Sequence, residues 1–259
     1  DHTRRAKRRH IAIANSKNNK ERKPLYQDLF KVTHKTFSAA HRLVNKYSGS
    51  RDSKVEQLCA ELQRYLELGR KVLSQAERRI LHGESVPVED KIVSIFEDHT
   101  DIIVKDRRKT HYGHKLNLAT GASGLILDCV VEQGNPSDVS RAVSLVERQR
   151  EIYNKIPRQV SLDGGYASKD NLQKIKDLGV KDVAFSKKRG LEIGEMEKSA
   201  WVYKKLKRFR AGIEAGISFL KRCFGLDRCT WRSLESFHSY VWGSVISANL
   251  MMLARHSLK

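Results

Sequence analysis

The spacing of apolar residues changes twice along the chain, and this change limits the fold more than any other sequence feature. From Val55 to Ile80, apolar side chains recur every three or four positions, which is the spacing of one face of a helix. Residues 110–190 instead contain short strand-like runs, and helical spacing returns after residue 203. A chain with this order of periods is expected to be an α/β protein.

The first helical region is expected to be a pair of antiparallel helices. One helix is predicted to begin after Pro24, because proline is favoured in the first turn of a helix. The turn Ser48-Gly49-Ser50 separates it from a second helix, predicted from about Lys54 to Ile80. Two long helices with a short connection pack side by side. Their apolar stripes need a partner surface, so we expect a packed insertion rather than a free linker.

The middle of the chain is expected to form a small sheet. Two strand-like segments, 112–118 and 124–131, flank a turn at 119–123 and predict a hairpin. Ser137 or Asp138 is available to cap the helix that follows. The elements expected next are a helix at 139–152, a strand at 160–162, a helix at 168–178, a strand at 182–185 and helices at about 203–224 and 234–255.

The charge of the chain indicates the class of its partner. The 259 residues include 50 Lys and Arg against 30 Asp and Glu, a formal net charge of +20. Such an excess favours a nucleic acid as partner. The sequence contains no run of about 18 apolar residues, so it predicts no membrane-spanning helix. The four cysteines have no C-x-x-C spacing and predict reduced thiols of a cytoplasmic protein rather than a zinc site.

Basic residues cluster at the beginning of the sequence. Residues 1–24 contain nine Lys and Arg against Asp1 and Glu21. Such a cluster is either a phosphate-binding arm or a solvated run of charges, and the two interpretations are equally open. The candidate DNA contacts in it are Arg4, Arg5, Arg8 and Arg9.

Asp163 is the first candidate for chemistry. It ends the short strand predicted at 160–162 and precedes Gly164 and Gly165. Functional groups of open α/β sheets lie at the carboxyl ends of strands, and the glycines leave room for a substrate or a close backbone. The alternative is that Asp-Gly-Gly is only a turn signal.

A second candidate lies on the helix predicted at 203–224. Arg210, Glu214 and Lys221 are spaced by four and seven residues, so all three project from one helix face. A carboxylate flanked by two cations suits a metal ligand beside phosphates, whereas the alternative is an ordinary salt bridge between neighbouring turns. The helix is too basic for self-pairing, which favours the functional interpretation. Its other candidate DNA contacts are Lys204, Lys205, Lys207 and Arg208.

These residues resemble a known signature. Arg210-x3-Glu214-x6-Lys221 is similar to the R-x3-E-x6-K part of the signature of bacterial insertion-sequence transposases of the DDE class. That signature usually opens with a tyrosine three residues before the arginine, where this chain has Lys207. The resemblance covers most of the chain, from Asp1 to about Arg255. Segments similar to one group of these transposases, often filed as ISNCY-like, are residues 94–100, 113–115, 134–138, 163–168 and 209–214.

The resemblance implies an RNase H-like catalytic core whose three carboxylates hold two divalent cations, Mg²⁺ or Mn²⁺. Such a core cleaves a phosphodiester and transfers the strand. Asp163 matches the second carboxylate and Glu214 the third, while Arg210 and Lys221 would contact phosphates near the cut. The implied partners are transposon ends and target DNA, bound by a homodimer at the bacterial nucleoid in the cytoplasm. The implied division is a basic arm at 1–24, a helical hairpin insertion at 25–85, and a core at 86–259 that lacks its first strand.

The first of the family's three catalytic carboxylates has no clear match in this chain. In the family it lies on the first strand of the core, usually in an Asp-x-Thr context. Asp1-His2-Thr3 has that spelling, but no strand precedes it. Asp128 lies on a predicted strand of the hairpin, where we expect it on the exposed face. The interpretation is therefore that the first strand and its Asp are missing and that this chain alone is inactive. The alternative is that Asp1 or Asp128 completes the triad.

Two other functions are alternatives to a DNA transposase. One is a catalytically inactive, DNA-binding transposase remnant. The other is an RNA-binding protein, which the aromatic content of 7% and the lack of a stacking motif disfavour. The transposase interpretation predicts that Asp163 and Glu214 approach each other and that their repulsion raises a pKa in the absence of a cation. It also predicts an unpaired edge beside residues 112–118 and 160–163.

Overall fold

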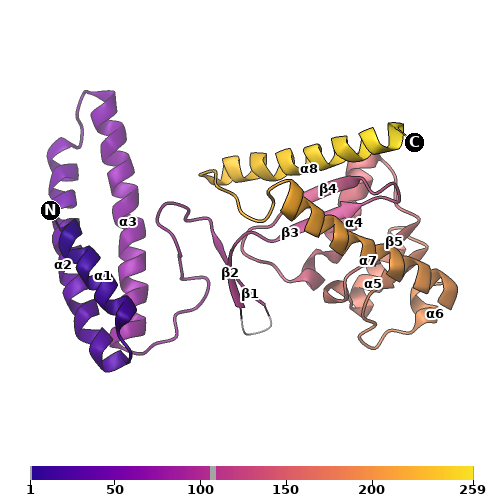
Figure 1. Ribbon diagram of the computed structural model, residues 1–259, viewed down its shortest axis with the longest axis horizontal. Coiled ribbons are helices and arrows are strands. Elements are labelled where there is room, and N and C mark those ends of the chain that lie inside the picture. The colour runs from indigo at the N-terminus through magenta and orange to yellow at the C-terminus, as the bar shows by residue number, and fades with distance from the viewer. Residues whose placement is uncertain (1, 106–108, 259) are drawn as a thin grey trace. The chain divides into compact units, whose positions relative to one another are not determined.

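The computed structural model describes residues 2–105 and 109–258, which fall into two compact units divided between Gly113 and His114. In the first unit, the helices α1 (Thr3–Asn15), α2 (Asn19–Tyr47) and α3 (Ser53–Leu81) pack in sequence order, α1 on α2 and α2 on α3 (Figure 1). The buried side chains of this packing include Phe30 and Val32 on α2 and Leu66 and Leu73 on α3.

The helical pair predicted from the sequence is present, but the predicted start of its first helix is wrong. The helix begins at Asn19, because the side chain of Asn18 accepts a hydrogen bond from the backbone N–H of Glu21 and caps the helix. Pro24 therefore lies inside α2. Close packing of α2 on α3 depends on Gly69, since a Cβ atom there would lie 2.6 Å from the ring of Phe37.

The predicted strand at 112–118 is also wrong, because it belongs to two different sheets. In the first unit, β2 (Lys109–Gly113) pairs antiparallel with β1 (Asp101–Lys105). Gly113 has a φ of 146°, which ends the strand. In the second unit, β3 (Leu116–Thr120) pairs antiparallel with β4 (Ile126–Val131), so the predicted hairpin exists with a later turn.

The remaining elements of the second unit agree with the sequence prediction within a few residues. Ser137 caps α4 (Asp138–Tyr153), and Ser168 caps α5 (Lys169–Asp177), each by accepting a backbone N–H. The parallel strands β5 (Gln159–Leu162) and β6 (Asp182–Phe185) lie on either side of the short helix η1 (Gly164–Tyr166) and α5 in the sequence. The helices α6 (Ile193–Met196), α7 (Ala200–Cys223) and α8 (Leu234–Ser257) complete the unit.

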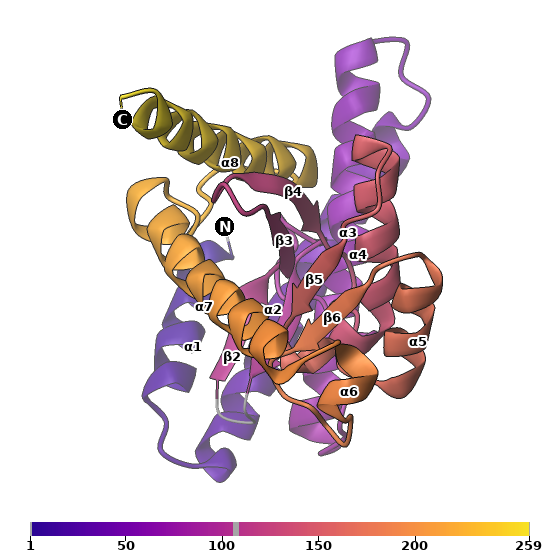
Figure 2. The ribbon, with the colours of Figure 1, turned by 90° about the vertical axis from the view of Figure 1, so that its right-hand side faces the viewer.

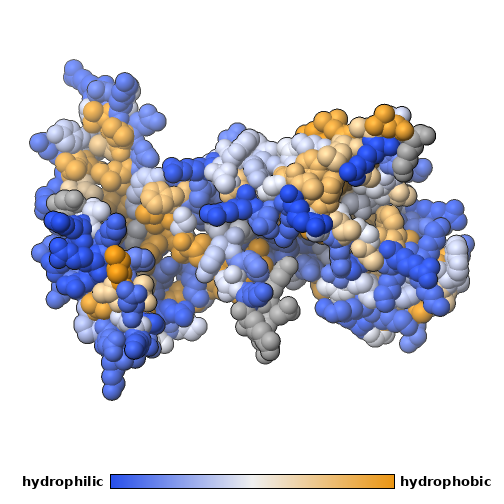
Figure 3. Space-filling view, in the orientation of Figure 1, coloured by the Kyte–Doolittle hydropathy of each residue, from blue (hydrophilic) through white to orange (hydrophobic). Residues whose placement is uncertain are grey.

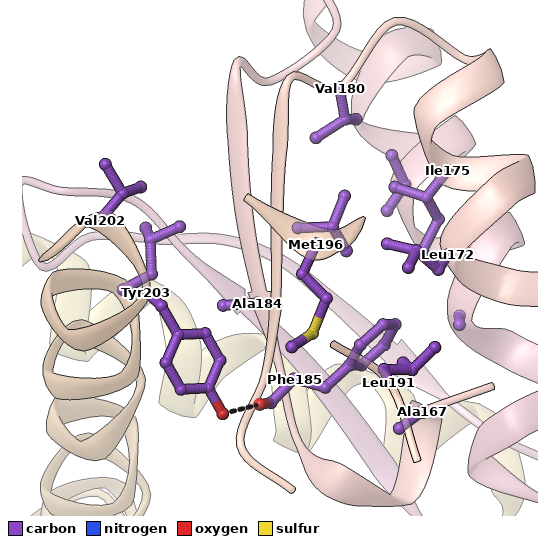
Figure 4. Packing of buried hydrophobic residues seen from close by; sticks show 14 residues of the cluster. Ala167, Leu172, Ile175, Val180, Ala184, Phe185, Leu191, Met196, Val202 and Tyr203 are labelled. Carbon is purple, nitrogen blue, oxygen red and sulfur yellow. Dashed lines mark hydrogen bonds between the residues drawn. The ribbon is translucent and has the colours of Figure 1, made fainter. Parts of the chain in front are cut away.

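The main hydrophobic core surrounds β6. Every residue of β6 is buried, and Phe185 packs among Leu172 and Ile175 of α5, Met196 and residues of α7 (Figure 4). The hydroxyl of Tyr203 donates to the backbone carbonyl of Phe185 at 2.9 Å and ties the start of α7 to this strand. The α5 and α7 helices are thereby held against the sheet that ends at Asp163.

A second, smaller core lies between β3, β4 and α8. It contains Cys129, Val241 and Val245, and all four cysteines of the chain are free thiols. Apolar side chains also remain exposed along α8, among them Ile246, Leu250 and Leu253 (Figure 3). No helix in the described part of the chain is long and apolar enough to cross a membrane.

The two sheets of the second unit are not hydrogen-bonded to each other. Within the described residues, β3 pairs only with β4, and β5 pairs only with β6. Figure 2 shows the four strands in the order β4, β3, β5, β6. The inner strand β5 is only partly buried, although the outer strand β6 is fully buried. An inner strand is normally the better covered one, so this reversal marks an unpaired edge at β5.

Candidate active site at Asp163, Arg210 and Glu214

Asp163 lies at the carboxyl end of β5, directly beside the end of β6. Its carboxylate accepts a hydrogen bond from the hydroxyl of Ser186 at 2.8 Å and from the backbone N–H of Gly164 at 2.6 Å. Ser186 follows β6 and donates its own N–H to the carbonyl of Leu162. Two adjacent parallel strands therefore fix this carboxylate, and such strand ends are where open α/β sheets place functional groups.

The two glycines after Asp163 are required by close contacts. A Cβ atom on Gly164 would lie 2.6 Å from the Cβ of Lys187, and one on Gly165 would clash with Oδ2 of Asp138. Any larger residue would push these neighbours away. The Asp-Gly-Gly segment does form a turn, η1, but its glycines also allow the ends of the strands β5 and β6 to pack tightly around Asp163.

Arg210 joins the two acids that the sequence predicts as catalytic. Its Nη2 atom lies 3.3 Å from Oδ2 of Asp163, and its Nη1 atom lies 3.0 Å from Oε1 of Glu214. The side chain of Arg210 is 21% exposed, whereas Asp163 and Glu214 are 52% and 68% exposed. One half-buried guanidinium thus holds together two solvent-facing carboxylates that come from β5 and α7.

The charges around Asp163 lower its pKa. Partial burial alone would raise the pKa, but the hydrogen bonds from Ser186 and Gly164 and the positive charges of Arg210 and Lys187 outweigh it. The expectation that repulsion between the two acids raises a pKa is therefore wrong for Asp163. The physical reasons are the hydrogen bonds from Ser186 and Gly164 and then the charge of Arg210, none of which the sequence places on Asp163.

The other predicted cations of α7 do not contact the acids. The Nζ atom of Lys221 lies 3.9 Å from the carboxylate of Asp227. The side chains of Lys204, Lys205, Lys207 and Arg208 are exposed to solvent. Their charged ends therefore face solvent.

The predicted contacts at the N-terminus lie in the first unit and are of two kinds. Arg5 and Arg9 both pair with the carboxylate of Asp28 on α2, and Arg5, the larger cause, and Arg9 together lower its pKa to about 2. Arg4 and Arg8 are exposed on α1. Arg5 and Arg9 therefore help to attach α1 to α2, whereas Arg4 and Arg8 face solvent.

Asp128 is not on an exposed face, so that expectation is wrong. Its side chain is buried, and it accepts hydrogen bonds from the guanidinium of Arg148 on α4, the shorter at 2.5 Å, and from its neighbour's N–H at Cys129. The helix α4 covers this face of β4, which the strand pattern alone does not reveal. The other candidate for the first carboxylate, Asp1, lies outside the described residues.

A buried polar network supports the turn that carries Asp163. Tyr166 of η1 donates its hydroxyl to Oδ1 of Asn117 on β3 at 2.6 Å, and Asn117 donates to Glu132, which also pairs with Arg141. Burial, followed by the nearby acids, raises the pKa of Tyr166 to about 12. Tyr166 therefore stays a neutral donor that links the β5 end to β3.

Three of the segments singled out in the sequence, 113–115, 134–138 and 163–168, lie next to one another. Lys115 donates to the carbonyl of Pro136 at 2.6 Å and to Asp138 at 3.1 Å, and Asp138 fills the space that a Cβ atom on Gly165 would need. Sequence reasoning did not identify Ser186, Tyr166, Asn117 or Glu132, because their roles depend on contacts between distant strands. The available signals were the position of Ser186 directly after a strand and the place of Tyr166 in the segment 163–168.

The described residues do not by themselves fit a site for two divalent cations. Asp163 and Glu214 provide oxygen ligands of the kind that Mg²⁺ and Mn²⁺ prefer. In the described ranges, however, no group of three His, Cys, Asp or Glu side chains is arranged to hold a metal ion. Arg210 already neutralises part of the charge of the two acids that are present.

One comparison with known proteins gives a match. A family model described as a transposase DDE domain matches residues 89–250. This range includes both acids, Arg210 and the polar network behind them. No curated protein and no solved structure matches the chain.

Proposed function

Since the chain belongs to the transposase DDE domain family, we propose that Asp163 and Glu214 are two of the acids with which an insertion-sequence transposase cleaves and joins DNA. The observation that carries this proposal is the shared contact of both carboxylates with Arg210. Exposed acids from a strand end and from a helix thus contact the same guanidinium. Such a constellation is typical of a reaction centre rather than of a packing contact.

The proposed core is RNase H-like and takes one more strand between β3 and β5. The free edges of these two strands and the incomplete burial of β5 support it. An apolar cavity of about 220 Å³ between β3, α7 and α8, lined by Leu118, Ile213 and Met252 among others, supports it as well. A strand placed there would pair with both edges and bring apolar side chains to this cavity.

The third acid is proposed to come with that strand. A carboxylate near the end of a strand next to β5 would lie beside Asp163, because the carboxyl ends of parallel strands meet at one edge of a sheet. Transposases of this family generally use divalent cations, and three acids would offer the oxygen ligands that Mg²⁺ or Mn²⁺ prefers. The described chain provides two of those acids.

The residues of this chain would mainly bind and orient DNA. Arg210 and Lys221 are proposed to contact phosphates near the cut, and Lys204, Lys205, Lys207 and Arg208 to bind the strand further along α7. The exposed Arg4 and Arg8 of α1 are proposed as separate DNA contacts of the first unit. We also propose that two copies act together at the nucleoid, because a transposase must hold two transposon ends.

A second candidate function is a DNA-binding transposase remnant without activity. It is favoured by the observation that only two acids meet at the site among the residues that the structure describes. The two candidates differ in whether the reading frame adds a strand with an acid before Asp1. The protein that includes such added residues is called the extended protein below.

A cleavage experiment distinguishes these functions. A supercoiled plasmid carrying the transposon ends is incubated with Mg²⁺ or Mn²⁺ and either the present chain or the extended protein. We expect the extended protein to nick the DNA and the present chain only to bind it. Replacing the acid of the added strand by its amide should abolish nicking. Asp170→Asn is the matched control, since Asp170 is an exposed acid that pairs with Lys174 on α5.

Nicking by the present chain that depends on Asp163 would show that the third acid lies within this sequence. An extended protein that binds DNA but never nicks it would favour the inactive remnant.

A further inference from the structure

An exposed aromatic ring lies among the lysines at the start of α7. The side chain of Trp201 is 69% exposed, although tryptophan is on average one of the more buried residues. The Nζ atom of Lys205 lies 5.4 Å from the centre of its ring, within the range of a cation–π contact. An indole held in solvent in this way offers a large flat surface to a ligand.

The neighbours of Trp201 form a basic surface on the same side of the helix. Lys204, Lys205 and Arg208 follow it at three, four and seven residues, which places all four side chains on one side of α7. The three cations are exposed, and the first acid along α7 is Glu214. This surface combines phosphate-binding charges with a stacking platform, the combination that binds single-stranded nucleic acid.

We propose that Trp201 stacks on an unpaired base of a DNA strand whose phosphates lie on Lys204, Lys205 and Arg208. The proposal deepens the proposed function and rests on it, because it names the form of DNA bound next to the acids. Inside a duplex, both faces of each base are covered by its neighbours, so away from the duplex ends only an unpaired base has a face free for the indole. A ligand made only of paired bases would use the lysines and leave the ring in water.

The platform is rigidly connected to the candidate active site. Val202 and Tyr203, next to Trp201, are buried, and the hydroxyl of Tyr203 is bonded to the carbonyl of Phe185. Trp201 precedes Arg210 by nine residues of one continuous helix, or about 14 Å along its axis at 1.5 Å per residue. A base bound by Trp201 would therefore lie a short stretch of strand away from Asp163 and Glu214.

The chain provides a matched control for this residue. Trp231 is also largely exposed, at 56%. It packs edge-on against Tyr240, with ring centres 5.6 Å apart. Trp201→Ala and Trp231→Ala thus each remove one exposed indole, but only the first removes an indole from the basic surface of α7.

The test measures binding of labelled DNA by fluorescence anisotropy at one salt concentration. The ligands are a single-stranded oligothymidylate and a blunt duplex of the same length, each titrated with the full chain and its variants. Stacking of one base on an aromatic residue contributes enough that its loss weakens binding about fivefold to a hundredfold. We expect this loss for Trp201→Ala on the single strand, less than about a twofold change on the duplex, and no change for Trp231→Ala on either ligand.

A second variant separates stacking from support of the helix. Trp201→Phe keeps an aromatic ring and should retain a large part of the single-strand affinity. Equal losses on single strand and duplex, or a loss no larger than that of Trp231→Ala, would overturn the proposal. That result would leave the proposed function intact, because duplex binding and cleavage do not depend on the ring. A chain that binds neither DNA would overturn both.

Discussion

Two pairs of acids lie in the C-terminal unit, and they differ in almost every physical respect. Asp163 and Glu214 are exposed and share the guanidinium of Arg210. Asp182 and Glu197 are both buried, at 3% exposure each. Asp182 accepts a hydrogen bond from Gln159, but neither carboxyl oxygen of Glu197 finds a hydrogen-bond donor within the described residues.

The pKa values of Glu197 and Asp163 are shifted in opposite directions from their ordinary values. Burial, and then the charge of Asp182, raises the pKa of Glu197 to about 7, with Lys176 acting against them. The pKa of Asp163 is lowered instead, because hydrogen bonds and cations outweigh its partial burial. The strongest perturbation of an acid in the unit therefore lies away from the candidate active site. Exposure and a shared cation, rather than the size of a pKa shift, are therefore the features that single out the proposed catalytic pair.

The largest expected effect comes from removing the buried charge. Glu197→Gln should raise the free energy of unfolding by about 2–3 kcal/mol at pH 8, since the folded state no longer holds a carboxylate that resists ionisation. Because the folded pKa of Glu197 lies above its ordinary value of 4.5, wild-type stability falls as the pH rises from 4.5 through about 7. The gain should therefore fade as the pH approaches 5.

Urea unfolding of both proteins at pH 5 and pH 8 checks this prediction. An equal gain at both pH values would mean that the introduced amide improves packing rather than removing a charge, and the contrast between the two acid pairs would lose its electrostatic basis.

A smaller effect is expected on DNA affinity. Asp163→Asn removes a negative charge from a site that phosphates approach and releases Arg210 from one partner, so duplex binding should strengthen about two- to fivefold, the range of a single exposed charge contact. Glu197→Gln should leave the affinity unchanged, because that acid is buried away from the surface. Anisotropy titrations at fixed salt measure both. Unchanged binding by Asp163→Asn would place the DNA elsewhere.

The smallest effect concerns the pKa of Asp163 itself. Ser186→Ala and Arg210→Gln should each raise this pKa, and Ser186→Ala should raise it more, because its hydrogen bond is the largest of the lowering contributions. Carboxyl NMR shifts of Asp163 across an acid titration measure the change. A group with a lowered pKa stabilises the fold above its ordinary pKa of 3.8 and loses that contribution as the pH falls. A larger shift for Arg210→Gln would make the cation, not the hydroxyl, the dominant partner.

Features of the fold that depend on residues close together in the sequence could be predicted. The helix starts at Ser137 or Asp138 and at Ser168 could be predicted because a cap bonds to an amide only three residues away, and in the structure Ser137 and Ser168 are the caps. Arg210 and Glu214 could be placed on one face because the helix period sets their direction.

Predictions from the sequence were wrong or missing where contacts between distant segments determine the structure. The burial of Asp128 depends on Arg148 of α4, and the division of residues 112–118 depends on two separate partner strands. The contacts of Ser186 and Tyr166 with Asp163 and Asn117 likewise join elements that no periodic pattern connects. The approach of Arg210 to Asp163 required the packing of α7 on β5, so the cation between the acids could not be predicted.

The central claim is that the exposed acid pair performs chemistry and the buried pair does not. It is tested most directly by comparing two double variants of the extended protein, Asp163→Asn with Glu214→Gln and Asp182→Asn with Glu197→Gln, in the same plasmid-nicking assay with duplex binding measured alongside. We predict that the first double variant loses nicking while it still binds duplex DNA, and that the second keeps nicking near the parent rate. Nicking near the parent rate by the first double variant would contradict the account, because the acids joined by Arg210 would then have no part in the reaction.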